Sequence, residues 1–279
     1  MKLSCMLFTF HSELKEGAYS PADLVSKLHG AGVRAVEPML RNLEDAPELW
    51  ADVMAAANDA GMVYSCLDIG ANLIGEGDAD RVTALDTVKQ GLDLCAELDC
   101  TVGLIPGSRP APGMSNDEGR KIYSEQLGKA AELAAPYGIS VCIEDFGVIP
   151  DFVCHSSHVL QVVSDAGPEV MVAWDNGNFL LADEWPVDAW PPLRDRTVHV
   201  HIKDWVPAPE GSDAGIVTPA GKRWVGSHIG QGQAQVAECL KLMHADGYDG
   251  WVSLEVSMRP ADDAAVIGAQ YLLEVAASL

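Results

Sequence analysis

Short apolar runs rich in branched residues alternate along this chain with longer stretches in which apolar residues recur at helical spacing. The short runs predict strands near residues 3–10, 33–38, 62–69, 101–105, 139–145, 170–175, 197–203 and 251–256. The longer stretches predict helices at 21–31, 47–60, 79–98, 115–136, 156–166, 186–193, 233–246 and 262–277. Alternating strands and helices indicate a parallel sheet, because parallel neighbours need a crossover that a helix supplies.

Eight strand–helix units within 279 residues have the size and count of a (β/α)8 TIM barrel, and we expect a single barrel domain over residues 1–279. An open doubly wound sheet is the alternative. It predicts a G-x-G-x-x-G turn after an early strand, and the chain has none. Residues 206–227 are rich in Pro, Gly and Asp, so we expect a long loop after the seventh strand.

Charge and cysteine content narrow the classes of function. The chain has 41 acidic and 18 basic residues and a formal charge of −23, which disfavours nucleic-acid and membrane partners. Its seven cysteines are scattered without a C-x-x-C pair, which favours reduced thiols in a cytoplasmic protein. No apolar segment reaches the length of a membrane span, and homo-oligomerisation is left open.

The four later strands carry polar groups on faces that should point into the barrel. Side chains alternate between the faces of a strand, and here one face of each strand is bulky and apolar while the other is mixed. At or near its C-terminal end, each mixed face has one polar group: Glu144, Asp175, His201 or Glu255. Because barrel active sites form at that rim, we expect the four groups to converge at the same height of their strands.

Three carboxylates brought together without a counter-charge would repel one another, and a bound cation resolves this. An oxygen-rich set with one imidazole and no thiolate predicts one divalent ion with open coordination positions. Mn²⁺ is the favoured ion, and Mg²⁺, Co²⁺ and Zn²⁺ are alternatives. The competing interpretation is that the acids cap separate turns and that His201 is a core histidine.

Other polar residues are predicted to lie near the same rim. Substrate contacts are predicted for His11, Glu37, Asn178, Lys203, Arg223 and His228. Structural roles are the alternative: Glu37 could support the metal ligands, and Lys203 could pair with a neighbouring acid. His199 shares the inward face with His201 but lies deeper, so an orienting or core role is favoured.

Four segments, VCIEDFG, VAWDNGNFLLADEWPVDAW, RTVHVHIKDW and WVSLEVS, resemble the xylose-isomerase-like TIM-barrel superfamily, in particular its sugar phosphate isomerase/epimerase-like proteins. That group includes ketose 3-epimerases, hydroxypyruvate isomerase, inosose isomerase and inosose dehydratase. The resemblance implies that Glu144, Asp175, His201 and Glu255 bind the metal and that Glu144 and Glu255 are also the catalytic acid/base groups. The chain departs from many members at Asn178, where they have a histidine.

The resemblance implies a divalent-metal-dependent isomerase or epimerase of a sugar or cyclitol, working by proton transfer through a metal-bound enediolate. A metal-dependent dehydratase or lyase acting on a keto-sugar, keto-glycoside or inosose is the first alternative. A non-catalytic sugar-binding barrel is the second. Lys222 and Arg223 are the only dense basic spot, which favours a neutral substrate over a phosphorylated one.

Overall fold

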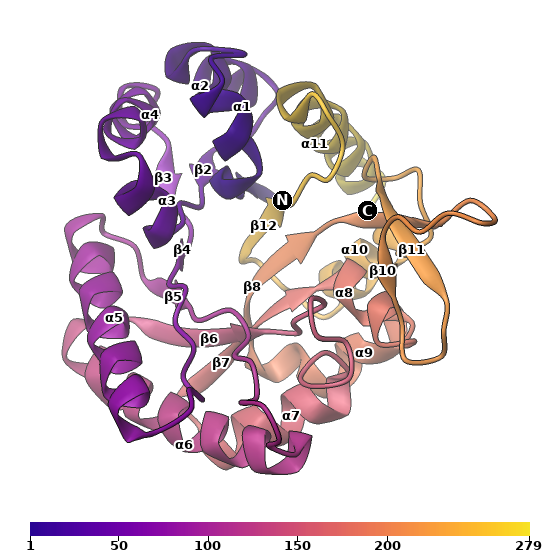
Figure 1. Ribbon diagram of the computed structural model, residues 1–279. Helices are drawn as coiled ribbons and strands as arrows, with labels where there is room; N and C mark the ends of the chain where they lie inside the picture. Colours follow the sequence, from indigo (N-terminus) through magenta and orange to yellow (C-terminus); the bar gives the residue numbers. More distant parts are fainter.

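The computed structural model describes residues 1–279 and contains a parallel barrel ringed by helices (Figure 1). Its largest sheet has seven strands in the order β1-β12-β8-β7-β6-β5-β4. Strand β2 closes the gap between β1 and β4: it pairs in parallel with β3, and bridges join Met6 to Glu37 and Met39 to Asp68. The chain therefore forms the predicted (β/α)8 TIM barrel.

The barrel strands follow the predicted order but are shorter at the start of the chain. They are β1 (Lys2–Cys5), β2 (Ala35–Val36), β5 (Val102–Leu104), β6 (Ser140–Glu144), β7 (Val170–Asp175), β8 (Thr197–Ile202) and β12 (Trp251–Leu254), with β3 (Val63–Tyr64) and β4 (Leu67–Asp68) as the two parts of the third barrel strand. The first strand ends at Cys5 rather than at residue 10. Leu7, Phe10 and Leu14 are buried at helical spacing, so η1 (Leu7–Phe10) and α1 (His11–Lys15) replace its second half.

Every predicted helix is present with its ends within three residues of the expected ones. These are α2 (Pro21–Gly30), α4 (Pro47–Asp59), α5 (Asp78–Glu97), α6 (Asn116–Ala134), α7 (Ser156–Ala166), α9 (Pro186–Leu193), α10 (Val236–Ala245) and α11 (Ala261–Ala277). Two short helices, α3 (Leu40–Asp45) and α8 (Asn176–Leu181), and the turns η2 (Ala135–Tyr137) and η3 (Arg194–Arg196) are additional. No helix combines the length and apolarity that a membrane crossing requires.

The segment after the seventh barrel strand is an ordered antiparallel sheet rather than a plain loop. Strands β9 (Asp204–Pro207), β10 (Ile216–Val217) and β11 (Arg223–Ser227) pair in the order β10-β11-β9 and project outward from the barrel (Figure 1). Trp205 and Trp224 are buried with residues of α8 in one apolar cluster. Burying these two aromatic side chains stabilises the sheet, which the Pro and Gly content of the segment did not indicate.

Two separate apolar clusters confirm which strand faces point inward. The main core includes Val141, Val172 and Trp174 and lies between the strands and the outer helices. A smaller cluster inside the barrel contains Cys142 and Ala173, which alternate with those residues along β6 and β7. The polar ends of the inward faces therefore meet at one rim of the barrel.

Candidate metal centre

Glu144, Asp175, His201 and Glu255 converge at the C-terminal ends of β6, β7, β8 and β12. Each residue offers one ligand atom, and these four atoms all lie within 4.8 Å of one another. The side chains of Asp175 and His201 are fully buried, whereas those of Glu144 and Glu255 are 8% and 16% exposed. The structure thus brings together the four residues that strand alternation singles out.

The four residues do not lie at one height of the sheet, which corrects the expectation from the sequence. Asp175 is level with His201, but Glu144 is level with Ala173, one inward position lower. Ser253 is level with His201, so Glu255 lies one inward position higher on β12. The strands of a barrel are tilted and staggered, and this stagger brings carboxylates of different ladder levels to one point.

Asp175 directs a single oxygen at the cluster. Its Oδ1 accepts hydrogen bonds from the backbone N–H groups of Gly177 (2.8 Å) and Asn178 (3.0 Å) at the start of α8. Its Oδ2 accepts no hydrogen bond and lies 3.0 Å from the ammonium of Lys203. Burial raises the pKa of Asp175 to about 8 even though Lys203 lowers it. The charged form of this carboxylate therefore needs further positive charge nearby.

His201 is held between two carboxylates. Its Nδ1 lies 2.7 Å from Oε1 of Glu144, and its Nε2 lies 2.9 Å from Oε1 of Glu37. Burial lowers the pKa of His201, but Glu37 and Glu144 raise it more, so it ends well above its ordinary value. A cation bound at Nδ1 would replace the proton there and leave Nε2–H to donate to Glu37. Glu37 is therefore placed to orient the ring of His201.

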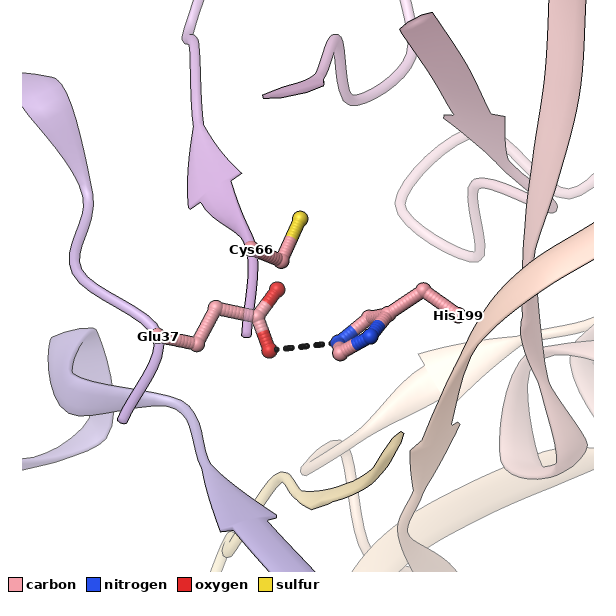
Figure 2. A group of neighbouring side chains, drawn as sticks. All are labelled: Glu37, Cys66 and His199. Carbon is pink, nitrogen blue, oxygen red and sulfur yellow. Dashed lines mark hydrogen bonds and ion pairs between the residues drawn. The ribbon is translucent and has the colours of Figure 1, made fainter. Parts of the chain in front are cut away.

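Glu37 also belongs to a second group of inward-facing residues. Figure 2 shows Glu37, Cys66 and His199 converging from three strand regions, and Oε2 of Glu37 lies 2.9 Å from Nε2 of His199. All three side chains are fully buried. Burial, and then a hydrogen bond with Cys142, raise the pKa of the Cys66 thiol well above its ordinary value. This group lies beneath the four-residue cluster, and within it Glu37 and His199 are hydrogen-bonded.

Lys203 enters the cluster from the end of β8. Its Nζ lies 2.6 Å from Oε1 of Glu255 and donates to Oδ1 of Asn178 at 3.2 Å. Burial lowers the pKa of Lys203, but Asp175 and then Glu255 raise it by more, so the pKa ends above its ordinary value. Gly177 makes room for the lysine, since a Cβ there would overlap the Lys203 side chain and lie 2.7 Å from Nε1 of Trp205.

A cavity of about 630 Å³ opens above the cluster. Glu144 and Glu255 line it together with Asn178 and Lys203, whereas Asp175 and His201 are not part of its wall. A molecule bound in this cavity would contact the two glutamates directly. The other two members of the cluster lie beneath them.

Of the six predicted substrate contacts, only Asn178 and Lys203 line this cavity; Glu37 is buried against His201 instead, and the other three lie elsewhere. His11 begins α1 because the first strand ends early, and its ring lies 2.9 Å from Oδ2 of Asp45 and accepts from Nε1 of Trp50 at 3.1 Å. Arg223 is on β11 and donates to a backbone carbonyl at 2.8 Å. His228 is half-buried just after β11, and its Nδ1 has no hydrogen-bond partner. None of the three lines the cavity.

Asp68 is a functional candidate that the sequence reasoning missed. Asp68 ends β4 and lines the cavity, and neither of its buried carboxylate oxygens accepts a hydrogen bond. Burial, and then the Glu37 carboxylate, raise its pKa well above the ordinary value. Alternation from Cys66 would have placed Asp68 inward. Asp204 accepts hydrogen bonds from three backbone N–H groups after β11 at 2.9 to 3.0 Å, which fixes that loop.

The donor set fits one divalent cation. With a neutral His201, the three clustered carboxylates and the Lys203 ammonium together carry two negative charges, which one divalent ion cancels. Oδ2 of Asp175 is free of hydrogen bonds, and the donors are oxygens and one imidazole, the set that Mn²⁺ and Mg²⁺ accept and that Zn²⁺ tolerates.

The family model described as "Xylose isomerase-like TIM barrel" matches residues 25–275. No protein of curated function matches the chain at a significant level of sequence similarity. Several solved structures share its fold. The probable 3-DHS dehydratase AsbF from Bacillus anthracis has a TM-score of 0.77 and 17% identity over 98% of this chain and 99% of that one.

Two further structures are similar over nearly the whole length. The IolI protein, solved with a bound zinc atom, has a TM-score of 0.76 and 16% identity, covering 100% of this chain and 99% of IolI. The 3-keto-D-glucoside 4-epimerase YcjR from E. coli has a TM-score of 0.69 and 19% identity, covering 99% of each chain. At these identities the likeness establishes the common barrel.

Proposed function

This chain belongs to the xylose isomerase-like TIM-barrel family, and from that premise we propose that it is a divalent-metal-dependent isomerase or epimerase of a sugar or cyclitol. The observation that carries the proposal is which residues of the cluster line the cavity and which do not. Glu144 and Glu255 line the cavity, while Asp175 and His201 lie buried beneath them. Two residues can therefore meet a substrate while all four hold an ion.

The ion, with Mn²⁺ favoured, would be held by Glu144, Asp175, His201 and Glu255, and when bound it supplies a Lewis acid that acidifies a C–H next to a carbonyl. Glu144 and Glu255 reach the cavity from different strands, so one can remove that proton and either can return it. Return to the neighbouring carbon gives an isomer, and return to the opposite face gives an epimer. Glu37 would hold the His201 ring in place during this exchange.

The relatives are consistent with this chemistry on the same barrel. The E. coli protein is named a 3-keto-D-glucoside 4-epimerase, and the IolI structure contains a zinc atom. The first name supports a sugar-converting role for a chain with this fold, and the second structure supports metal binding by it.

The test is deuterium exchange followed by NMR, with a panel of ketoses, aldoses and cyclitol ketones in D₂O and added Mn²⁺. We expect deuterium at the carbon next to the carbonyl, and a loss of at least about 100-fold in exchange rate in Glu144→Gln and in Glu255→Gln, because general acid–base catalysis contributes about that much. Glu184→Gln is the matched control, since Glu184 caps α7 through Ser156 and belongs neither to the cluster nor to the cavity wall. Wild-type exchange in both site variants would refute the proposal.

A dehydratase is the second candidate, and the position of Lys203 favours it. Its buried ammonium lies 2.6 Å from Glu255 and lines the cavity, where its positive charge could stabilise a departing hydroxyl through a hydrogen bond. AsbF, which shares the fold, is named a probable 3-DHS dehydratase. Loss of water from the substrate, without deuterium in the recovered substrate, would select this reaction. Absence of both exchange and metal binding would indicate a non-catalytic barrel.

A further inference from the structure

The nine arginines of this chain divide into two groups by the partners of their guanidinium groups. Seven donate hydrogen bonds to the protein: Arg34, Arg81, Arg120, Arg194, Arg196, Arg223 and Arg259. The guanidinium groups of Arg41 and Arg109 form neither a hydrogen bond nor an ion pair, although the chain has 41 acidic residues. These two arginines both line the cavity above the cluster.

Arg41 and Arg109 occupy the half of the rim that supplies no residue to the four-residue cluster. Arg41 is in the first turn of α3, which follows β2, and Arg109 is in the segment after β5. Strand β4 lies between β2 and β5 in the barrel, and residues 70–72, which follow it, also line the cavity. The clustered carboxylates come from β6, β7 and β12 on the remaining arc. A molecule in the cavity would therefore have the cluster on one side and the arginines on the other.

The backbone that carries Arg109 is fixed. Its own N–H donates to Oδ1 of Asn72 at 3.2 Å, and the hydroxyl of the preceding Ser108, which is fully buried, accepts from the N–H of Leu73 at 2.8 Å. Pro110 follows directly and restricts the chain further. The guanidinium thus starts from a preorganised loop, which lowers the entropy lost when it binds a ligand.

The electrostatic setting explains what two such guanidiniums would bind. A chain with a net charge of −23 repels anions, and Glu144 and Glu255 add negative charge to the cavity wall. An anion can enter only where local cations outweigh this field. The planar fork of arginine matches the oxygens of a carboxylate or a phosphate, whereas a neutral polyol would leave both positive charges without a partner.

We propose that the substrate carries a carboxylate or phosphate group at the end remote from its reacting carbon, and that Arg41 and Arg109 bind this group at the cavity mouth. The inference rests on the proposed function of the same site and adds the substrate class. It replaces the expectation of a neutral substrate, which rested on Lys222 and Arg223 being the only dense basic spot in the sequence. Lys203 is already engaged by Asp175 and Glu255, so it contributes little to this anion site.

The test compares matched probes that differ by one anionic group, titrated calorimetrically into the full-length protein with Mn²⁺. One pair is the methyl ester of quinate and quinate itself, which tests a carboxylate, and the other is fructose and fructose 6-phosphate, which tests a phosphate. We expect the anionic member of at least one pair to bind about tenfold more tightly or better, as charge-assisted hydrogen bonds allow. Added salt should reduce this preference.

The double variant Arg41→Gln/Arg109→Gln should lose the preference while the neutral probes bind as before. Both side chains are exposed and unpartnered, so the fold should be unaffected, which circular dichroism verifies. Arg34→Gln is the control, because it removes one positive charge at the opposite, N-terminal end of β2. Equal wild-type affinity within both pairs, or a preference that survives in the double variant, would overturn the inference. Binding requires no turnover, so failure of the deuterium-exchange test is a separate result.

Discussion

Replacing Glu37 by glutamine tests whether the layer beneath the cluster controls metal binding. In the wild type, one carboxylate oxygen lies 2.9 Å from His201 Nε2 and the other lies 2.9 Å from His199 Nε2, and all three side chains are fully buried. Burial raises the pKa of Glu37, but His201 and then His199 lower it by more, so the pKa ends well below its ordinary value. The wild-type group is therefore a charged acceptor for both rings.

Glutamine keeps one acceptor oxygen and replaces the other with a donor. Glu37→Gln can thus keep only one of the two hydrogen bonds without a change of tautomer. Loss of one hydrogen bond to a charged group should lower the free energy of unfolding by about 1.5–3 kcal/mol. Removal of a partner that orients a metal ligand should weaken metal affinity by about 10–100-fold. Both effects arise without a change in any residue of the four-residue cluster.

Two measurements separate these effects. Urea unfolding of the metal-free variant gives the stability change, and competition with a chelator of known affinity gives the dissociation constant for Mn²⁺. Glu184→Gln also loses hydrogen bonds of a partly buried carboxylate, but away from the cluster, so it should lose stability and keep its metal affinity. If Glu37→Gln bound Mn²⁺ within twofold of wild type, the orienting role of Glu37 would be refuted.

Three further predictions concern the cluster and its lysine. Chelation should lower Tm and Mn²⁺ should restore it, because the ion offsets repulsion among the carboxylates; an unchanged Tm in thermal-shift assays would argue against a metal centre. Gly177→Ala should displace Lys203 and cost about 1–3 kcal/mol in unfolding free energy, whereas the open helical site in Gly30→Ala should tolerate the same change. Lys203→Met should destabilise the metal-free protein by about 3–5 kcal/mol, because Asp175 and Glu255 lose their counter-charge, and it should enlarge the Tm shift caused by Mn²⁺. A metal-induced shift no larger than that of wild type would contradict this account of the lysine.

Strand alternation predicted the convergence of the cluster because it acts within regular, buried strands. Asp175 is the last residue of β7 and His201 the penultimate residue of β8, and each strand runs for six residues, so their inward direction followed from counting. The relative heights did not follow, because register depends on barrel stagger and on the irregularity between Val172 and Ala173. Distance between ligands is a property of the closed barrel rather than of any one strand.

The less regular segments were not predictable in the same way. The apolar run at the start of the chain contains both a strand and a helical turn, and this moved His11 from the expected rim into α1. Arg41 and Arg109 lie in a short helix and a loop, where alternation gives no direction. Their lack of partners emerges only when every guanidinium contact in the folded chain is known. Loops and short helices depend on tertiary contacts that local spacing does not contain.

The charge distribution around the cavity gives the proposed substrate an orientation. One arc of the rim presents the carboxylates of Glu144 and Glu255, and the other presents the guanidiniums of Arg41 and Arg109. An anionic group entering in the reverse direction would meet the carboxylates, and like charges in a partly buried site repel strongly. In the forward direction the same group pairs with the arginines and leaves the uncharged carbonyl end at the cluster. On this proposal, the charges that select an anionic substrate also place its reacting carbon beside the two glutamates.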